Sequence, residues 1–154
     1  MARLTFKKIK IILIKVDVKE IISMLGNARQ FKRYVFICGN GGSACDSEHL
    51  AEDLLIKNVR AIALTNVGVI TSLANDFDYS EVFSRQLEVY ANKDDILITL
   101  SCSGTSKNIV NAQTKAKELG MSTIIFPTNN DTRLQTSLTQ NEHKKLIHEI
   151  YEGL

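Results

Sequence analysis

The sequence of 154 residues contains no tryptophan, one proline and three cysteines. The odd cysteine count, without a Cys-x-x-Cys pair, argues against a disulfide scaffold or a zinc knuckle and fits a reducing compartment. The sequence contains neither Gly-Lys-Ser/Thr nor Gly-x-Gly-x-x-Gly, which excludes the usual P-loop and dinucleotide motifs. A phosphate site in this chain would therefore have to be built in another way.

Strong charge and long apolar runs are also lacking. The formal net charge is +2, too small to predict a nucleic acid or an acidic membrane as partner. The apolar stretch from Ile9 to Val16 is interrupted by Lys10 and Lys15, is too short to cross a bilayer and has no small-residue cleavage site. We therefore expect a cytoplasmic protein of one globular domain, with no nucleic-acid and no membrane partner.

The most informative stretch is a glycine-rich turn between an expected strand and an expected helix. Residues 34–38 are apolar, as in a buried strand, and Leu50, Leu54 and Leu55 recur on one face of a helix expected over about 43–57. The turn at 39–43 reads Gly-Asn-Gly-Gly-Ser. Glycines allow a close approach of backbone to ligand, and free N–H groups at a helix start favour an anion such as phosphate. An ordinary βα turn with a serine cap is the alternative.

A second turn of similar chemistry follows another apolar strand, expected at 96–100. Residues 101–106 carry four hydroxyl groups next to an expected helix start, at Ser101, Ser103, Thr105 and Ser106. Neutral donors and a helix dipole can hold a phosphate dianion without lysine or arginine. Two such turns favour a small phosphorylated ligand over a nucleotide, with a pair of ordinary serine caps as the alternative.

Strands and helices are expected to alternate along the whole chain. Residues 75–80 are expected to form a loop, 127–136 an irregular segment, and 4–16 either a strand or another buried segment. This alternation predicts a three-layer α-β-α domain whose mostly parallel sheet has four or five strands, with the ligand at the carboxyl ends of the strands. The further strands are expected at 60–65 and 123–126, and the further helices at about 17–26 (ending at Gly26), 69–74, 80–91, from the second turn to Gly120, and from 138 or 139 onward.

Several blocks, in this order, resemble the sugar isomerase (SIS) domain and most closely the phosphoheptose isomerases. They are residues 39–46 followed by His49, Asn75-Asp76-Phe77, Phe83-Ser84-Arg85, and the serines of 101–106. The resemblance covers 34–128 continuously and 138–150 more weakly. It implies a flavodoxin-like fold and a cytoplasmic, zinc-binding homotetramer with active sites at subunit interfaces. Such enzymes interconvert sedoheptulose 7-phosphate and D-glycero-D-manno-heptose 7-phosphate in lipopolysaccharide biosynthesis.

The resemblance also implies roles for individual residues. It makes Asp53 the catalytic base, and we take His148 as the acid. It implies one Zn²⁺ per subunit, bound by His49, Asp53, Gln140 and His148. The residues that it places around the substrate are Asn40, Gly41, Gly42, Ser43, Asp53, Asn75, Asp76, Ser101, Cys102, Ser103, Ser106 and Gln140.

These residue types suit aldose–ketose isomerisation, which needs a base and an acid, commonly a carboxylate and an imidazole. His49 and Asp53 are four residues apart and share a helical face, near which Glu52 also lies, and such a pair can bind Zn²⁺. Gln140 and His148 are eight residues apart, or ~12 Å along a straight helix. We therefore expect one ion to take some of its ligands from a neighbouring subunit.

Plainer roles are the alternatives for several of these side chains. His49 would then be a hydrogen-bonded histidine on a half-buried helix, and His148 would only flank the core. His143 is expected to face solvent, beside two lysines. Cys102 is expected to pack rather than act as a nucleophile, because no His or Lys is adjacent in sequence to activate the thiol.

We therefore predict a phosphosugar isomerase that acts through an enediol, with a SIS domain at 31–154 and a helical oligomerisation segment at 1–30. The alternative is a non-catalytic SIS module that binds a phosphosugar or a protein partner. Departures from the family pattern favour that alternative: Asp53 replaces a glutamate, Lys57 an arginine and Ser137 an aspartate. The shorter loops favour it as well.

Overall fold

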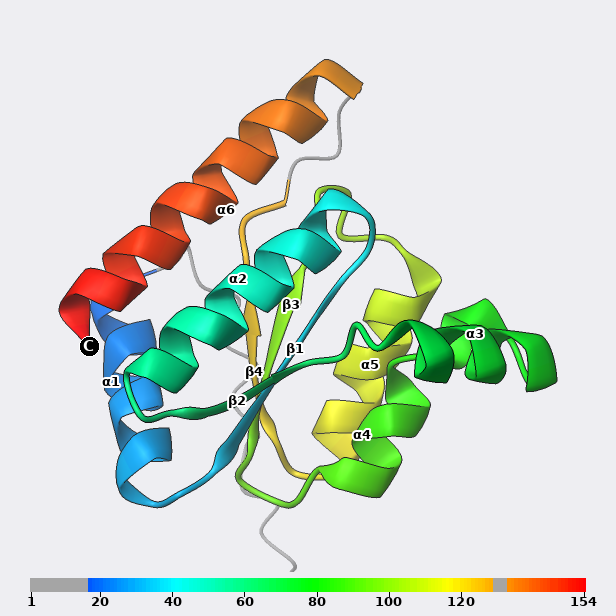
Figure 1. Cartoon of the computed structure of the whole chain (residues 1–154), viewed down its shortest axis with the longest axis horizontal. Helices are drawn as coiled ribbons and strands as arrows, with labels where there is room; N and C mark the ends of the chain where they lie inside the picture. The colour runs from blue at the N-terminus through cyan, green and yellow to red at the C-terminus, as the bar shows by residue number, and fades with distance from the viewer. Residues whose placement is uncertain (1–16, 129–132) are drawn as a thin grey trace, which may run out of the picture.

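The computed structural model describes residues 17–128 and 133–154, which form three layers (Figure 1). The middle layer is a sheet of four parallel strands in the order β2-β1-β3-β4. This confirms the predicted three-layer fold, with four strands among the described residues. The strands are β1 (Tyr34–Gly39), β2 (Arg60–Ala63), β3 (Ile96–Leu100) and β4 (Ser122–Ile125).

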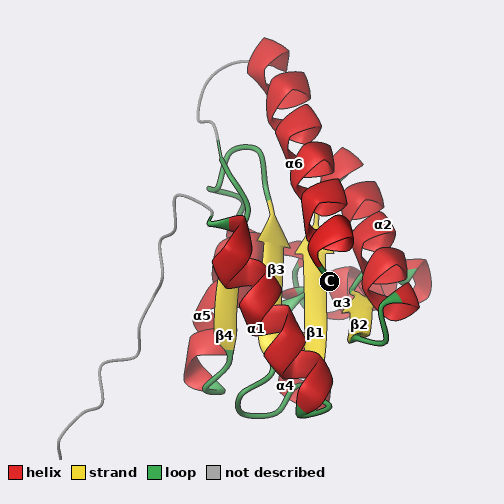
Figure 2. Ribbon diagram, turned by 90° about the vertical axis from the view of Figure 1, so that its left-hand side faces the viewer, coloured by secondary structure: helices red, strands yellow, loops and turns green. Residues whose placement is uncertain are grey.

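Helices cover both faces of the sheet (Figures 1 and 2). On one face lie α1 (Val18–Gln30), α2 (Gly42–Ile56) and α6 (Arg133–Gly153). The other face carries α3 (Val67–Asp76), the short 3-10 helix η1 (Tyr79–Glu81), α4 (Ser84–Tyr90) and α5 (Lys107–Glu118). In the described chain, no helix combines the length and the apolar character needed to cross a bilayer.

Strand alternation divides the interior into two cores. Val35 and Ile37 of β1 point into the core beneath α1, α2 and α6, whereas Phe36 and Cys38 point into the core beneath α4 and α5. The two central strands, β1 and β3, are almost wholly buried, and the edge strands β2 and β4 are partly exposed. A parallel sheet covered on both faces requires such continuous apolar central strands, which explains why these two were recognisable in the sequence.

Several predicted boundaries were wrong. Helix α1 does not end at Gly26 but continues to Gln30, because Leu25 and Ala28 pack into the core and outweigh the ~1 kcal/mol cost of a helical glycine. Residues 75 and 76 complete α3 rather than forming a loop, and the helix expected at 80–91 is divided into η1 and α4. Helix α6 begins at Arg133, because threonine and serine at 136–137 disfavour a helix only weakly.

Helix α1 shares its core with the sheet. Ile21, Leu25 and Ala28 contact the same apolar cluster as Ile147 and Ile150 of α6. The oligomerisation role of segment 1–30 stays a prediction. The expectations for 4–16 and for the stretch from Ile9 to Val16 lie outside the described residues.

The chain order creates a crevice position between β1 and β3. After β1 the chain passes to β2 on one side, and β3 then pairs with β1 on the other, so the strand order reverses there. Ligands of open parallel sheets bind at the carboxyl ends of the strands at such a reversal. Gly39 at the end of β1 is in register with Leu100 at the end of β3, which places the two predicted turns side by side.

Candidate functional site

The first turn joins β1 to α2 and depends on glycine for its shape. Gly41 caps the start of α2 with φ 56° and ψ −123°, a conformation that residues with a Cβ strongly avoid. Gly42 follows, and a Cβ at that position would collide with the side-chain amide of Gln140 on α6. The turn is closed by the Ser43 N–H, which donates to the Asn40 carbonyl at 3.0 Å.

The second turn joins β3 to α5 and is organised by its own hydroxyl groups. Ser101 Oγ accepts from the Gly104 N–H at 3.0 Å, and Ser103 Oγ accepts from the Thr105 N–H at 3.2 Å. Ser106 caps α5 without a side-chain cap bond. A serine hydroxyl that accepts one bond can still donate its proton, so these residues can offer O–H donors to an anion.

The two turns meet at one edge of the sheet, as the sequence predicted. Ser43 Oγ lies 4.0 Å from Cys102 Sγ, and Ser43 is only 3% exposed. The amides of Asn40 and Asn108 also pair across the turns, as described below. Cys102 donates to the Thr136 carbonyl at 3.8 Å, a contact that agrees with its expected packing role.

Helices α2 and α6 run side by side in the same direction (Figure 1). Gly42, the first residue of α2, lies against Gln140, which is about two turns into α6. Further along, the rings of His49 and His148 meet edge to face, with centroids 5.5 Å apart. The helix pair therefore brings His148 to the side chain that the sequence had predicted as its neighbour in a site.

A carboxylate completes this group. Asp53 Oδ2 lies 3.5 Å from His49 Nε2, and the Asp53 side chain is 16% exposed, whereas Glu52 is exposed. Asp53, rather than Glu52, is therefore the carboxylate beside His49. Gln140 lies about two helical turns from His148, ~12 Å along α6, and belongs with the first turn instead. Within 17–128 and 133–154, no three His, Cys, Asp or Glu side chains are grouped closely enough to hold a metal ion.

His143 does not face solvent, and that prediction was wrong. It is fully buried on α6, with Nε2 2.7 Å from the Pro127 carbonyl and its ring edge to face with Phe126. Because a carbonyl can only accept, Nε2 carries the proton. Among the described residues, neither Nδ1 of His143 nor Oδ2 of the buried Asp46 has a hydrogen-bond partner. The prediction failed because it was based on the adjacent Lys144 and Lys145. These two lie on the exposed face of α6, whereas His143 lies on the face that packs into the core.

Asn75 and Asp76 lie at the exposed end of α3, where Asn75 Nδ2 donates to Asp76 Oδ1 at 2.9 Å. The next segment, η1, is tied to the first turn, because the Tyr79 hydroxyl donates to Asn40 Oδ1 at 3.0 Å. The segment that follows the pair is thus bonded to the site, while the role of Asn75 and Asp76 as ligands of sugar hydroxyls stays a prediction.

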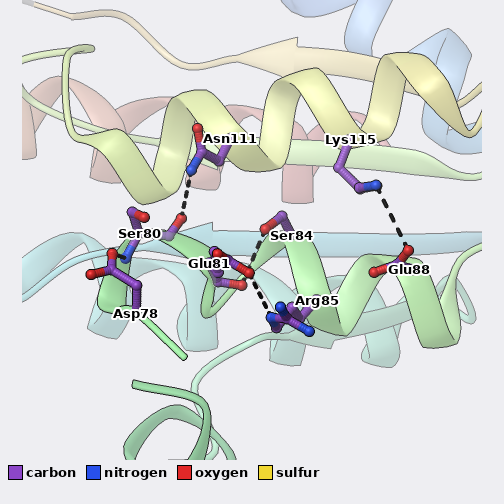
Figure 3. Close-up of polar contacts among 8 residues, drawn as sticks. All are labelled: Asp78, Ser80, Glu81, Ser84, Arg85, Glu88, Asn111 and Lys115. Carbon is purple, nitrogen blue, oxygen red and sulfur yellow. Dashed lines mark hydrogen bonds and ion pairs between the residues drawn. The ribbon is translucent and has the colours of Figure 1, made fainter. Parts of the chain in front are cut away.

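A separate polar cluster joins α4 to η1 and α5 (Figure 3). Arg85 donates to Glu81 at 2.6 Å and its guanidinium lies 3.5 Å from the ring centre of Phe77. Lys115 pairs with Glu118 at 3.0 Å, and hydrogen bonding to that carboxylate raises the pKa of Lys115. Arg85 of the family motif is thus paired with Glu81 and links α4 to η1 here.

Asn108 is a residue of the site that the sequence reading missed. It is 2% exposed and lies on the buried face of α5, next to Ile109 and one turn before Ala112. A polar side chain on an otherwise apolar helical face has to be hydrogen-bonded. That position on the stripe was the signal that could have identified it.

Comparison with known proteins gives one family and a consistent set of relatives. The SIS domain matches residues 15–126. The phosphoheptose isomerase of Helicobacter pylori (strain P12) is 43% identical over 113 residues, which are 69% of this chain and 59% of that protein. The phosphoheptose isomerase of Clostridium acetobutylicum is 42% identical over 117 residues, 71% of this chain and 60% of its own. The chain thus spans about 60% of the length of these curated relatives.

Two solved structures resemble the fold closely. The phosphoheptose isomerase of Neisseria gonorrhoeae superposes with a TM-score of 0.79 at 26% identity, and that of Francisella tularensis with 0.81 at 27%. Each superposition covers 88% of this chain and 83% of the other. The three-layer architecture described above is therefore that of these structures.

Proposed function

This chain belongs to the SIS domain family, and on that basis we propose that it is a phosphosugar aldose–ketose isomerase of the phosphoheptose type. Its substrates are sedoheptulose 7-phosphate and D-glycero-D-manno-heptose 7-phosphate. The observation that carries the proposal is the grouping of three side chains. His49 and Asp53 lie on α2, which begins at the first turn, and His148 reaches His49 from α6.

The reaction moves a proton between two neighbouring carbons. Asp53 takes the proton from the carbon beside the carbonyl, the C–H electrons form the enediol double bond, and His148 gives a proton to the carbonyl oxygen. Return of a proton to the other carbon, with loss of one from the second oxygen, gives the isomer. Both groups are of the type that enzymes use for such transfers, and Asp53 is largely enclosed.

The phosphoryl end of the sugar lies against the two turns. Ser101, Ser103 and Ser106 supply O–H donors, and the N-termini of α2 and α5 supply N–H groups and the positive ends of their dipoles. The first turn and Cys102, Asn75, Asp76 and Gln140 complete the proposed surroundings of the substrate. The shape of the first turn comes from glycines, so the substrate can approach its backbone closely.

We propose Zn²⁺ as the metal of this site, with His49 and Asp53 as two ligands and His148 and Gln140 as the others. The fit is incomplete within one chain, because the described residues group no three His, Cys, Asp or Glu side chains and Gln140 lies ~12 Å from His148 along α6. A second copy has to supply the missing ligands, and no chemical step is assigned to the ion. Zinc titration by calorimetry tests this: fewer than one ion per chain excludes it.

We also propose a cytoplasmic homotetramer that serves lipopolysaccharide synthesis. The assembly is supported by the large apolar side chains on the surface, a pattern typical of interaction sites. The most exposed are Phe31, Leu55, Ile56, Val67 and Val89, each more than half exposed. Sedimentation at working concentration gives the mass, and a monomer contradicts the assembly.

The activity is tested by following conversion of sedoheptulose 7-phosphate, with and without zinc. Asp53→Asn and His148→Gln each lower kcat by about 100-fold or more, because they remove the base or the acid. Glu52→Gln is the matched control, since it removes an exposed carboxylate next to Asp53 and leaves kcat within about twofold. Binding of the sugar phosphate without any turnover supports the non-catalytic module instead.

A further inference from the structure

We propose that Asn108 is a positioning residue whose side-chain amide pairs with that of Asn40 and so holds the first turn in its ligand-binding shape. This amide pair is the latch, and it occupies the side chain of Asn40, which therefore does not contact the substrate. The inference deepens the proposed function, because it rests on phosphate binding at the two turns. It differs from the family resemblance, which places Asn40 among the residues that surround the substrate.

The contacts of Asn40 leave little of its side chain for a ligand. Its Nδ2 donates to Asn108 Oδ1 at 2.9 Å, and its Oδ1 accepts from Asn108 Nδ2 at 2.8 Å. The same Oδ1 accepts from the Tyr79 hydroxyl at 3.0 Å. Both lone pairs of the oxygen are therefore used, and a single N–H remains free.

The composition of the turn explains why such a latch is needed. Three of the four residues from Gly39 to Gly42 are glycines, so Asn40 carries the only side chain before Ser43. A glycine-rich segment has many accessible conformations and binds a ligand more weakly unless something fixes it beforehand. Within Gly39–Gly42, the amide of Asn40 is the side-chain group to which the rest of the protein can hydrogen-bond in order to fix this turn.

The partner of Asn40 is well placed for that purpose. Asn108 is 2% exposed, and its Oδ1 also lies 3.0 Å from the Ile109 N–H. It is the second residue of helix α5. Helix α5 begins at Lys107, directly after Ser106, the last residue of the second turn. The amide pair therefore sets the spacing between the two turns, and Tyr79 adds η1 to the same junction.

The chain offers a matched control one turn along the same helix. Asn111 Nδ2 donates to the Ser80 carbonyl at 3.0 Å, so it ties α5 to η1 but not to the first turn (Figure 3). Asn108→Ala and Asn111→Ala each remove an amide that anchors α5 to another segment. Only the first substitution releases the turn.

The experiment measures binding of sedoheptulose 7-phosphate and of inorganic phosphate to the full chain by calorimetry. Asn108→Ala weakens both ligands by about tenfold or more, while Asn111→Ala stays within about twofold at a similar loss of melting temperature. Asn108→Asp keeps the size and serves where the alanine variant folds poorly. It is expected to weaken binding further, because its carboxylate cannot donate to Asn40 and repels the anion.

Additivity distinguishes a latch from a direct contact. If Asn40 acts through Asn108, then Asn40→Ala, Asn108→Ala and the double variant lose the same affinity; a direct contact by Asn40 makes the double variant clearly weaker than Asn108→Ala. Unchanged binding by Asn108→Ala, or equal loss by Asn111→Ala, overturns the proposal.

If the wild-type chain binds neither ligand, the proposed function fails. The latch is then judged by the unfolding constants of Asn40→Ala, Asn108→Ala and the double variant. If the change in the double variant equals the product of the two single changes, the latch is overturned. If it is several-fold smaller than that product, the latch is supported.

Discussion

The two turns at the sheet edge follow the same plan of strand, small residues and helix, yet they are built in opposite ways. The first is shaped mainly by packing: Gly42 lies against Gln140 and Asn40 against Asn108, both outside the turn, and Gly39 lies close to Ser43 within it. The second is shaped by its own hydroxyls, which accept hydrogen bonds from the N–H groups of the same turn. One turn thus supplies a rigid outline and the other supplies chemical groups.

This difference predicts where substitutions act. Changes in the first turn should disturb packing and be felt in stability or in the position of Gln140. Changes in the second should alter ligand affinity at little cost to the fold. The predictions that follow test this division, from the largest expected effect to the smallest.

Gly39→Ala is expected to be the most damaging substitution. A Cβ there would lie 2.7 Å from the Ser43 carbonyl carbon, and backbone cannot move aside cheaply. The free energy of unfolding should fall by about 2–3 kcal/mol, as measured by urea denaturation. Gly26→Ala is the control, because a Cβ meets nothing within 4 Å in the middle of α1 and should stabilise by about 0.5–1 kcal/mol. Equal effects of the two substitutions would contradict the packed outline of the first turn.

Gly41→Ala and Gly104→Ala compare the two turns directly. Both glycines have positive φ, 56° and 68°, so each alanine should cost about 1–3 kcal/mol of strain. Gly104 also lies near Thr128, whose Cγ2 would be 3.1 Å from an added Cβ, while Gly41 faces open space. Melting curves should therefore show a somewhat larger loss for Gly104→Ala. The reverse order would show that steric room does not decide the cost.

Ser103→Ala should separate affinity from stability. It removes an O–H donor from the second turn, so phosphate affinity should fall by about tenfold, the value of one hydrogen bond to a charged group. The melting temperature should change little, because Ser103 is only partly buried. Ser43→Ala is the comparison in the first turn. A large stability loss for Ser103→Ala would place its role in the fold instead of the ligand.

The smallest expected effect is an acid dependence near the junction of the turns. Hydrogen bonds from Ser80 hold the pKa of the Asp78 carboxyl below its ordinary value, with Lys107 contributing. The folded state therefore gains stability from Asp78 above the unfolded pKa, and loses it as pH falls through the folded pKa. The melting temperature of the wild type minus that of Asp78→Asn should be constant near neutrality and shrink in acid. A difference that grows in acid would contradict this sign.

The sheet and the two turns were predictable because their signals are local. Val35 to Cys38 and Ile96 to Leu100 are continuous apolar runs, and the small residues after them directly mark the turns. His49 and Asp53 were recognisable as a pair, since helical periodicity alone places them on one face. These features need no knowledge of distant parts of the chain.

The rest depends on how helices pack. Nothing near Gln140 in the sequence shows that it lies against Gly42 while His148 reaches His49, because that follows from the relative position of α2 and α6. His143 was misread for the same reason: its neighbours are polar, and only the tertiary contact with Phe126 and Pro127 shows it to be buried. The apolar face on which Asn108 lies could have marked it as hydrogen-bonded, but that its partner is Asn40 follows only from the tertiary structure.

Helix α3 contributes no fully buried side chain; Ile70, Leu73 and Ala74 only rest against the core beneath α4 and α5. Segments with so little buried surface open by local fluctuation, at far lower free energy than global unfolding. Its backbone amides should accordingly exchange with deuterium ahead of those in the central strands. Asn75 and Asp76 can therefore change position while the sheet beneath them stays intact.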